Sequence, residues 1–270
     1  MVAANVAQRE RLSGPEEDAW AGRAGNFRAD PARPLDTLLT KIASYVQPDD
    51  TLIDVGGGAG RLSLPLAERC REVVVVDPSA AMREGFEAVI KSSGINNARF
   101  IEADWLDADG IEGDVALVAH VTYFVPKIAS FVQKLNSATR RRVIVCVRSV
   151  PPPNQIAGFF SLAHGEDYAP VPGHQELLSL LSEMGIEAEL IDCGPAIASA
   201  TATIGKTRQD AIRNEVESAI KAGWLGGVAP ERLGELINQH FGELLVETDK
   251  GFLRRCVVDA RALLITWETR

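Results

Sequence analysis

Residues 52–61, with the sequence LIDVGGGAGR, constrain the fold of this chain more than any other stretch. An apolar run as long as a buried strand carries one acid, Asp54, and is followed by Gly56, Gly58 and Gly60. Glycines let backbone N–H groups approach a ligand, and the positive end of a following helix favours an anion. Asp54, however, would repel a phosphate. The residues around the loop therefore have to identify its ligand.

From residue 35 onward, apolar runs alternate with segments of helical periodicity. This is typical of a parallel sheet covered by helices on both faces. The first five runs lie about 15 to 30 residues apart, as crossover helices require. We predict an α/β fold with a doubly wound, mostly parallel, seven-stranded sheet. The predicted strands are Thr51–Val55, Glu72–Val76, Ala98–Ala103, Val115–Ala119, Val143–Val147, Glu187–Ile191 and Ala262–Trp267.

The segments at the beginning of the chain predict helices. Pro34 suits the first position of a helix whose apolar residues recur from Leu35 to Val46. Ser13 and Glu16 form a possible capping box for a further helix that carries Trp20. We therefore expect residues 1–34 to form an N-terminal helical lid ahead of one domain, residues 35–270.

Two additions interrupt the regular pattern of that domain. Residues 151–173 are rich in proline and predict an irregular insertion, not a crossover helix. Within it, His164 and residues 166–168 form a polar cluster that could contact a substrate or simply face solvent. Residues from about 205 to 245 predict two helices, beginning near Thr207 and at Pro230, which form a small helical cap.

Composition limits the classes of partner. The chain has 270 residues, of which 46% are hydrophobic, enough for one large core or a core with a subdomain. The net charge is −9, and Arg140, Arg141 and Arg142 are interpreted as a solvated strand entrance. We therefore expect small-molecule partners and no nucleic acid. Four separate cysteines without a CxxC pair predict neither a metal site nor a redox motif. With no signal peptide or membrane span evident, the expected location is the cytoplasm.

Polar residues follow the other predicted strands as well. The dinucleotide fingerprint requires a small residue at position 61, where this chain has Arg61, so a nicotinamide-dependent oxidoreductase is disfavoured. Asp77 ends the second strand, where an acid can accept ribose hydroxyls. Asp104 and Trp105 follow the third strand, and His120 and Tyr123 follow the fourth.

In this order, these motifs resemble the class I S-adenosylmethionine-dependent methyltransferase family, over roughly residues 35–200. The resemblance rests on the glycine motif from Asp54 to Gly60, on the acids Asp77 and Asp104, and on the segment from Asp114 to Val121. The stretches FRADPARPLDTLLTKI and AHVTYFVPKIASFV are similar to an uncharacterised bacterial subgroup of that family. The implied fold is the Rossmann-like methyltransferase fold.

The resemblance implies S-adenosylmethionine as cofactor, S-adenosylhomocysteine as product, and no metal. Asp54 would then attract the positive charge of the cofactor, and the loop glycines would admit its methionine end. Asp77 would hold the ribose and Asp104 the adenine edge. The other cofactor-binding candidates are Gly56, Gly58, Gly60, Pro78, Met82, Trp105, His120 and Arg28.

The expected reaction is in-line methyl transfer to a hydroxyl or amine of a small molecule. His120 is the candidate base, because imidazole titrates near neutral pH, and Tyr123 is a second catalytic candidate. Either residue could instead only line the pocket. The alternative function is a non-catalytic regulatory protein that binds S-adenosylmethionine or S-adenosylhomocysteine, since its cofactor residues would look the same.

Overall fold

The computed structural model of the chain describes residues 1–13, 30–196 and 203–269. The chain divides into two compact units. The first, here called the sheet unit, contains Glu17–Val147, His174–Gly194 and Ala262–Arg270. The second, the helical unit, contains Met1–Glu16, Arg148–Gly173 and Pro195–Arg261. None of the helices in the described ranges has the length and hydropathy needed to cross a membrane.

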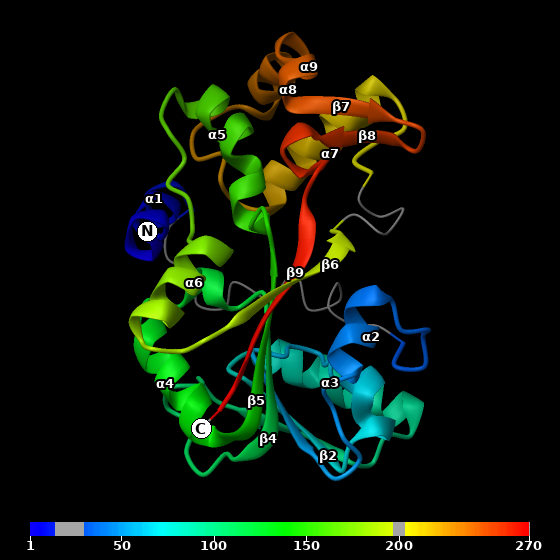
Figure 1. The fold of residues 1–270 in the computed structure, drawn as a ribbon. Helices are drawn as coiled ribbons and strands as arrows, with labels where there is room; N and C mark the ends of the chain where they lie inside the picture. The colour runs from blue at the N-terminus through cyan, green and yellow to red at the C-terminus, as the bar shows by residue number, and fades with distance from the viewer. Residues whose placement is uncertain (14–29, 197–202, 270) are drawn as a thin grey trace. The chain divides into compact units, whose positions relative to one another are not determined.

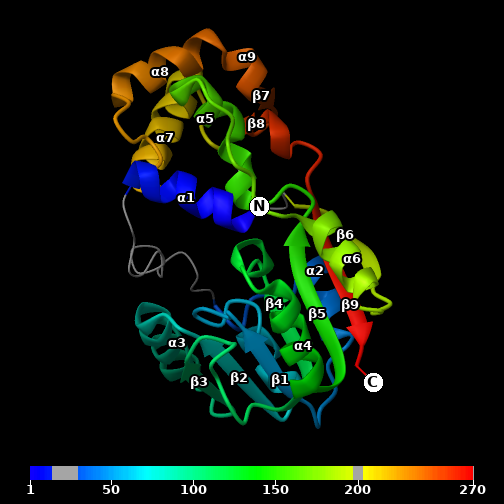
Figure 2. The same cartoon turned by 90° about the vertical axis from the view of Figure 1, so that its left-hand side faces the viewer.

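A seven-stranded sheet with the strand order β3-β2-β1-β4-β5-β9-β6 organises the sheet unit. Strands β1 to β5 pair in parallel, and Figure 2 shows β3, β2 and β1 side by side. Ser149 N donates to Arg261 O and Thr269 N to Arg141 O, which is the register of an antiparallel β5–β9 pair. The prediction of a doubly wound, mostly parallel sheet is confirmed. The strands are β1 (Thr51–Val55), β2 (Glu72–Asp77), β3 (Ala98–Glu102), β4 (Gly113–Ala119), β5 (Thr139–Arg148), β6 (Glu189–Pro195) and β9 (Arg261–Glu268).

Helices cover both faces of the sheet. In Figure 1, α2 (Thr37–Ala43) and α3 (Ala80–Ser93) lie on one side, and α4 (Ile128–Ala138) and α6 (His174–Glu183) lie on the other. The first of these helices begins later than predicted from Pro34. Asp36 is its N-cap, and the Asp36 side chain accepts a hydrogen bond from Leu39 N at 2.8 Å.

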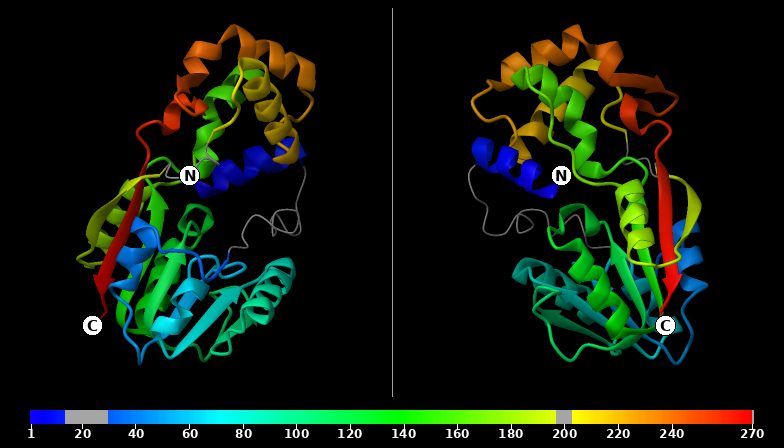
Figure 3. Two further views of the ribbon diagram at one scale, coloured as in Figure 1. Left: turned by 90° about the vertical axis from the view of Figure 1, so that its right-hand side faces the viewer. Right: turned by 60° about the vertical axis from the view of Figure 1, so that its left-hand side comes forward.

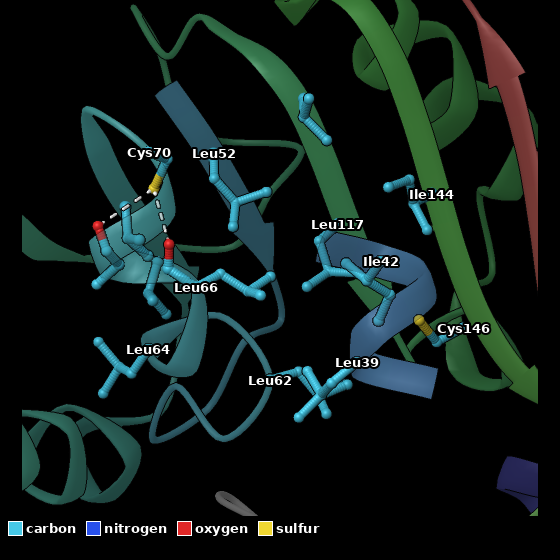
Figure 4. Close-up of a cluster of buried hydrophobic side chains, with 14 of the residues drawn as sticks. Leu39, Ile42, Leu52, Leu62, Leu64, Leu66, Cys70, Leu117, Ile144 and Cys146 are labelled. Atoms are coloured by element: carbon cyan, nitrogen blue, oxygen red, sulfur yellow. Dashed lines mark hydrogen bonds between the residues drawn. The ribbon is translucent and has the colours of Figure 1, made fainter. Parts of the chain in front are cut away.

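The core on the α2 side of the sheet consists of side chains that alternate along the strands. Figure 4 shows Leu39 and Ile42 of α2 packed over Leu52, Leu117 and Ile144, which come from β1, β4 and β5. All five are fully buried. Burying side chains of this size contributes about 1.5–3 kcal/mol each. This packing fixes the central strands, and with them the residues that follow their ends.

The arginines lie at the start of β5, as predicted, and each of them is also ion-paired. Arg140 contacts Asp114 at 2.8 Å, and Arg142 contacts Glu268 at 2.5 Å. Arg141 pairs with Asp50, whose side chain is only 6% exposed. Two of the acids lie in the neighbouring strands β4 and β9, and Asp50 directly precedes β1, an arrangement that the local sequence does not show.

The helical unit has its own core. Its elements are α1 (Val2–Ser13), η4 (Pro152–Ile156), α5 (Ala157–His164), α7 (Arg208–Lys221), α8 (Pro230–Gln239), α9 (Phe241–Leu244), η6 (Arg255–Val257) and the hairpin β7 (Leu245–Thr248) and β8 (Gly251–Arg254). Figure 3 shows the blue N-terminal helix beside the green and orange helices of this unit. Phe160, Trp224, Leu233 and Ile237 are among the buried residues of the core. Thr207 caps α7 by accepting from Asp210 N, as its spacing predicts.

Two predictions about this unit are wrong. Residues 151–173 are not irregular throughout, because α5 buries Phe159 and Phe160 and ends at Gly165, which has a φ of 67°. The prolines of the segment all lie outside α5. Ser13 is the last residue of α1, so it is not the N-cap of a helix. Glu16 and Trp20, the other parts of the predicted lid helix, lie outside the described residues.

The polar cluster of the insertion connects its segment to α1 and to the core of the helical unit. Asn5 is 1% exposed and donates to Tyr168 Oη at 3.0 Å, and Gln8 donates to Asp167 O at 2.9 Å. Glu166 pairs with Arg11, and His164 lies 2.9 Å from Trp224 O. His164 and Tyr168 therefore connect this segment to the helical unit, whereas Glu166 and Asp167 are exposed, in agreement with the expectation that part of the cluster faces solvent.

A buried ion pair joins α7 to β8. Glu215 is 3% exposed and accepts two hydrogen bonds of 2.7 Å from Arg254. Removing one partner of such a pair leaves the other charge buried and costs about 3–5 kcal/mol. The Asp210–Arg213 pair, by contrast, is more exposed, and a surface pair contributes about 0–1 kcal/mol.

We predict that Arg254→Met lowers the free energy of unfolding by several kcal/mol, because the buried Glu215 carboxylate would lose the positive charge of Arg254. Arg213→Met is the matched control and should change stability by less than about 1 kcal/mol. Denaturant unfolding of the two variants, followed by tryptophan fluorescence, measures the difference. Equal effects of the two substitutions would contradict this assignment.

Candidate active site

A pocket of about 310 Å³ lies at the carboxyl ends of β1 to β4, within the sheet unit. It brings together most of the residues predicted to bind the cofactor, from four separate stretches of sequence. Those that line it are Asp54, Gly56, Gly58, Asp77, Pro78, Met82, Asp104, Trp105 and His120. Parallel strands place their carboxyl ends at one edge of a sheet, which explains why residues so distant in sequence converge.

Asp54 is the buried acid of this pocket. It is 1% exposed, and neither carboxyl oxygen has a hydrogen-bond partner among the described residues. Gly57 makes room for it, because a Cβ atom at position 57 would lie 2.4 Å from Asp54 Oδ2. The second glycine of the run, Gly57, is therefore required for space above the carboxyl group, a role that was not predicted from the sequence.

Burial raises the pKa of the Asp54 carboxyl group from 3.8 to about 7. The Ser63 hydroxyl lies close enough to oppose the rise, although neither group reaches hydrogen-bonding geometry with a partner. The Asp77 carboxylate adds to the rise, and the Arg61 guanidinium opposes it. An acid in this environment gains strongly from a cation that enters the pocket.

The glycine loop leads into a 3-10 helix, η2 (Leu64–Arg69), where the sequence predicted an ordinary helix start. Gly56, Gly58 and Gly60 all have positive φ values, of 67°, 55° and 75°. A Cβ atom at Gly60 would lie 2.6 Å from Leu64, so Gly60 faces the core and does not line the pocket. Gly58 lies against Met82, whose Sδ is 3.3 Å from the position of a Cβ atom there.

Asp77 connects the glycine loop to the turn that follows β2. Its Oδ2 accepts from Gly58 N at 3.0 Å, and its Oδ1 accepts from Ser79 N at 3.0 Å. Ser79 in turn caps α3 by accepting from Met82 N. The Asp77 carboxylate therefore connects the backbone of the glycine loop to the backbone of the turn after β2 without a bound ligand.

The third strand contributes one exposed and one buried residue. Asp104 is exposed, and its Oδ1 accepts from Leu106 N at 2.8 Å. Trp105 is 4% exposed, its Nε1 has no partner among the described residues, and its ring packs edge-on against Phe131. Lys134 lies 5.3 Å from the centre of the Trp105 ring and donates to Leu106 O at 3.0 Å. Trp105 thus forms a flat, fixed wall.

The fourth strand places His120 in the pocket and Tyr123 behind it. Tyr123 is 1% exposed and does not line the pocket, and its hydroxyl lies 3.4 Å from His120 Nδ1. Arg28 lies outside the described residues. Further lining residues were not predicted, and several adjoin predicted ones: Val55, Gly57, Arg61, Leu62, Val76, Leu106, Ala119, Val121, Phe124, Val125, Pro126 and Phe131.

Comparison with known proteins defines the class of this domain. Residues 52–142, from β1 into β5, match the family described as a methyltransferase domain. A solved S-adenosylmethionine-dependent methyltransferase from Thiobacillus denitrificans, in complex with S-adenosyl-L-homocysteine, superimposes with a TM-score of 0.53 over 95% of this chain and 99% of its own, at 12% identity. This likeness supports the fold, and the fold and the family match together define a Rossmann-like methyltransferase domain. The family match covers residues 52–142 of the 270 residues, and within them the chain is similar to the class I S-adenosylmethionine-dependent methyltransferases.

Two relatives are named as 23S rRNA (uracil(1939)-C(5))-methyltransferases. The protein from Aeromonas hydrophila subsp. hydrophila is 43% identical over 68 residues, which is 25% of this chain and 14% of the relative. The protein from Pseudomonas putida is 33% identical over 90 residues, 33% of this chain and 20% of the relative. The chain thus spans a fifth or less of the length of these relatives.

These relatives correct one prediction. The expectation of a small-molecule acceptor with nucleic acids excluded is wrong, because proteins that match the chain are named as rRNA methyltransferases. The exclusion relied on a net charge of −9. That number averages over the whole surface, whereas recognition of an acceptor depends on the charges beside one pocket.

We predict that Asp54→Asn stabilises the protein increasingly as the pH rises. Between pH 4 and 7 the folded protein holds a proton on Asp54 that the unfolded chain releases, so stability from this group is lost as the pH rises toward the folded pKa. At pH 8 the free energy of unfolding of Asp54→Asn should exceed that of the wild-type protein by at most about 4 kcal/mol. Denaturant unfolding across pH 4 to 8 measures it, and Asp104→Asn, at an exposed site, is the control. A difference that does not change with pH would contradict the burial argument.

We also predict that Gly57→Ala weakens cofactor binding tenfold or more, since its Cβ atom would displace the Asp54 carboxyl group or the loop. Gly227→Ala is the matched control, because no atom lies within 4 Å of a Cβ atom at position 227. Titration calorimetry with S-adenosylmethionine gives both dissociation constants. If Gly57→Ala binds S-adenosylmethionine with unchanged affinity, cofactor binding does not depend on the observed position of the Asp54 carboxyl group.

Proposed function

We propose that this protein transfers a methyl group from S-adenosylmethionine to a hydroxyl or amine of an acceptor. The observation that carries the proposal is the Asp54 carboxyl group, which is buried in the pocket and has no hydrogen-bond partner for either oxygen within the described part of the chain. Such a group is costly unless a ligand compensates it. A sulfonium cofactor with an α-ammonium group supplies the positive charge, whereas a pyrophosphate would add repulsion.

The residues present fit this cofactor. Asp54 and the adjoining glycine loop would meet its cationic methionine end, and Asp77 would accept hydrogen bonds from the ribose in addition to its two backbone contacts. Asp104 and the Trp105 wall would hold the adenine. When bound, the cofactor supplies a methyl group already activated by the sulfonium charge. The residues of the chain then mainly hold the methyl group and the acceptor in position, which can lower the barrier to methyl transfer by several kcal/mol.

The acceptor has to approach the pocket near His120, the polar side chain that follows β4. The names of the relatives make an RNA acceptor one candidate. His120 could take a proton from the acceptor or donate a hydrogen bond to it. These two roles require different protonation of the same imidazole ring.

The proposal is tested by incubating the protein with S-adenosylmethionine labelled in its methyl group, and with separated RNA and small-molecule fractions of a bacterial cell extract. We expect label to enter one fraction with the wild-type protein and not with Asp54→Ala. Cofactor binding without transfer to any fraction would instead support the alternative, a non-catalytic protein that binds S-adenosylmethionine.

We further predict that Asp77→Ala weakens binding of S-adenosylmethionine by about 1–3 kcal/mol, which is roughly 5- to 150-fold in the dissociation constant. The substitution removes the acceptor of both Gly58 N and Ser79 N as well as the proposed ribose contact. Asp107→Ala, at an exposed position outside the pocket lining, is the control. An unchanged constant in Asp77→Ala, measured by calorimetry, would remove the ribose assignment.

A further inference from the structure

His120 has an unusual backbone conformation at the pocket. Its φ is 62°, and it is the one non-glycine residue with positive φ in the described ranges. This left-handed conformation is unfavourable for an L-residue, because its Cβ atom comes too close to a carbonyl oxygen. A hydrogen bond from His120 N to Cys146 O, 2.9 Å long, holds the turn against β5. Strained backbone conformations persist where the surrounding structure enforces them. Here the strained residue, His120, lines the pocket.

Tyr123 fixes the ring of the same residue. It lies on the 3-10 turn η3 (Thr122–Phe124), and its hydroxyl is 3.4 Å from His120 Nδ1. The two rings are nearly parallel, with an angle of 21° and centroids 6.1 Å apart. Tyr123 also packs edge-on against Phe124, which lines the pocket. A buried tyrosine packed on both sides has little freedom to move, so it defines where Nδ1 lies.

The chemistry of the pair determines which group donates. A phenol is a better donor than a neutral imidazole N–H, and an unprotonated imidazole nitrogen is a good acceptor. If the Tyr123 hydroxyl donates to Nδ1, the single proton of the neutral ring resides on Nε2.

We propose that Tyr123 is a positioning residue that holds His120 as a hydrogen-bond donor through Nε2–H. This inference rests on the proposed methyl transfer. It assigns His120 to orienting an acceptor oxygen by donating to one of its lone pairs, and not to removing a proton. The acceptor class is then a hydroxyl whose oxygen attacks the methyl group with its second lone pair and whose proton leaves to water after transfer.

Nitrogen NMR of protein labelled in its histidine rings tests the assignment directly, with no cofactor or acceptor present. The chain has four histidines, and His120→Gln identifies the signals of His120. At a pH where the ring is neutral, we expect Nε2 to carry the proton in essentially all molecules. In Tyr123→Phe, which keeps the packed ring but removes the hydroxyl, this preference should be lost and both tautomers should be populated.

Tyr168→Phe is the matched control, because it removes another buried tyrosine hydroxyl, one that accepts from Asn5, and should leave the His120 signals unchanged. A wild-type ring protonated at Nδ1 would overturn the proposal and favour His120 as a base. If Tyr123→Phe leaves the tautomer of His120 unchanged, Tyr123 is not the residue that positions the His120 ring. The wild-type spectrum is decisive even if a variant fails to fold. Since no transfer is measured, failure of the methyltransferase proposal would appear separately, as absence of label transfer.

Discussion

The constraint around which this site is arranged is a buried carboxyl group that has no hydrogen-bond partner among the residues the structure describes. Asp54 lies in β1, between the paired strands β2 and β4, and is 1% exposed. Desolvation of a carboxylate is expensive, and the raised pKa of Asp54 expresses that cost. The protein retains the acid because the pocket beside it admits a cation.

The other parts of the site follow from the direction of the strands. The parallel pairing of β1 to β4 brings the loop, Asp77, Trp105 and His120 to one edge, and local contacts then hold each of them. Asp77 joins two backbone segments, Lys134 lies over Trp105, and Tyr123 sets the ring of His120. The pocket is therefore largely formed before a ligand binds, which reduces the ordering cost of binding.

Much of the sheet could be predicted from the sequence, because strands buried on both faces are continuous apolar runs such as Val73–Val76. The polar residues at the strand ends could be predicted for the same reason. Contacts between side chains that are far apart in the sequence could not be predicted. The acids opposite Arg140 and Arg142, the partners of Glu166, and the space that Gly57 leaves for Asp54 depend on segments far apart in sequence or on exact side-chain direction. The left-handed backbone of His120 likewise has no sequence signal, since most residues in such a run remain extended.

The buried Asp54 implies that the glycine loop receives a cationic amino-acid cofactor and not a dinucleotide. Titration calorimetry of the wild-type protein with S-adenosylmethionine and, separately, with NAD distinguishes these two ligands. We expect saturable binding of S-adenosylmethionine that is lost in Asp54→Ala, and no binding of NAD at the same concentrations. Saturable binding of NAD without binding of S-adenosylmethionine would contradict it.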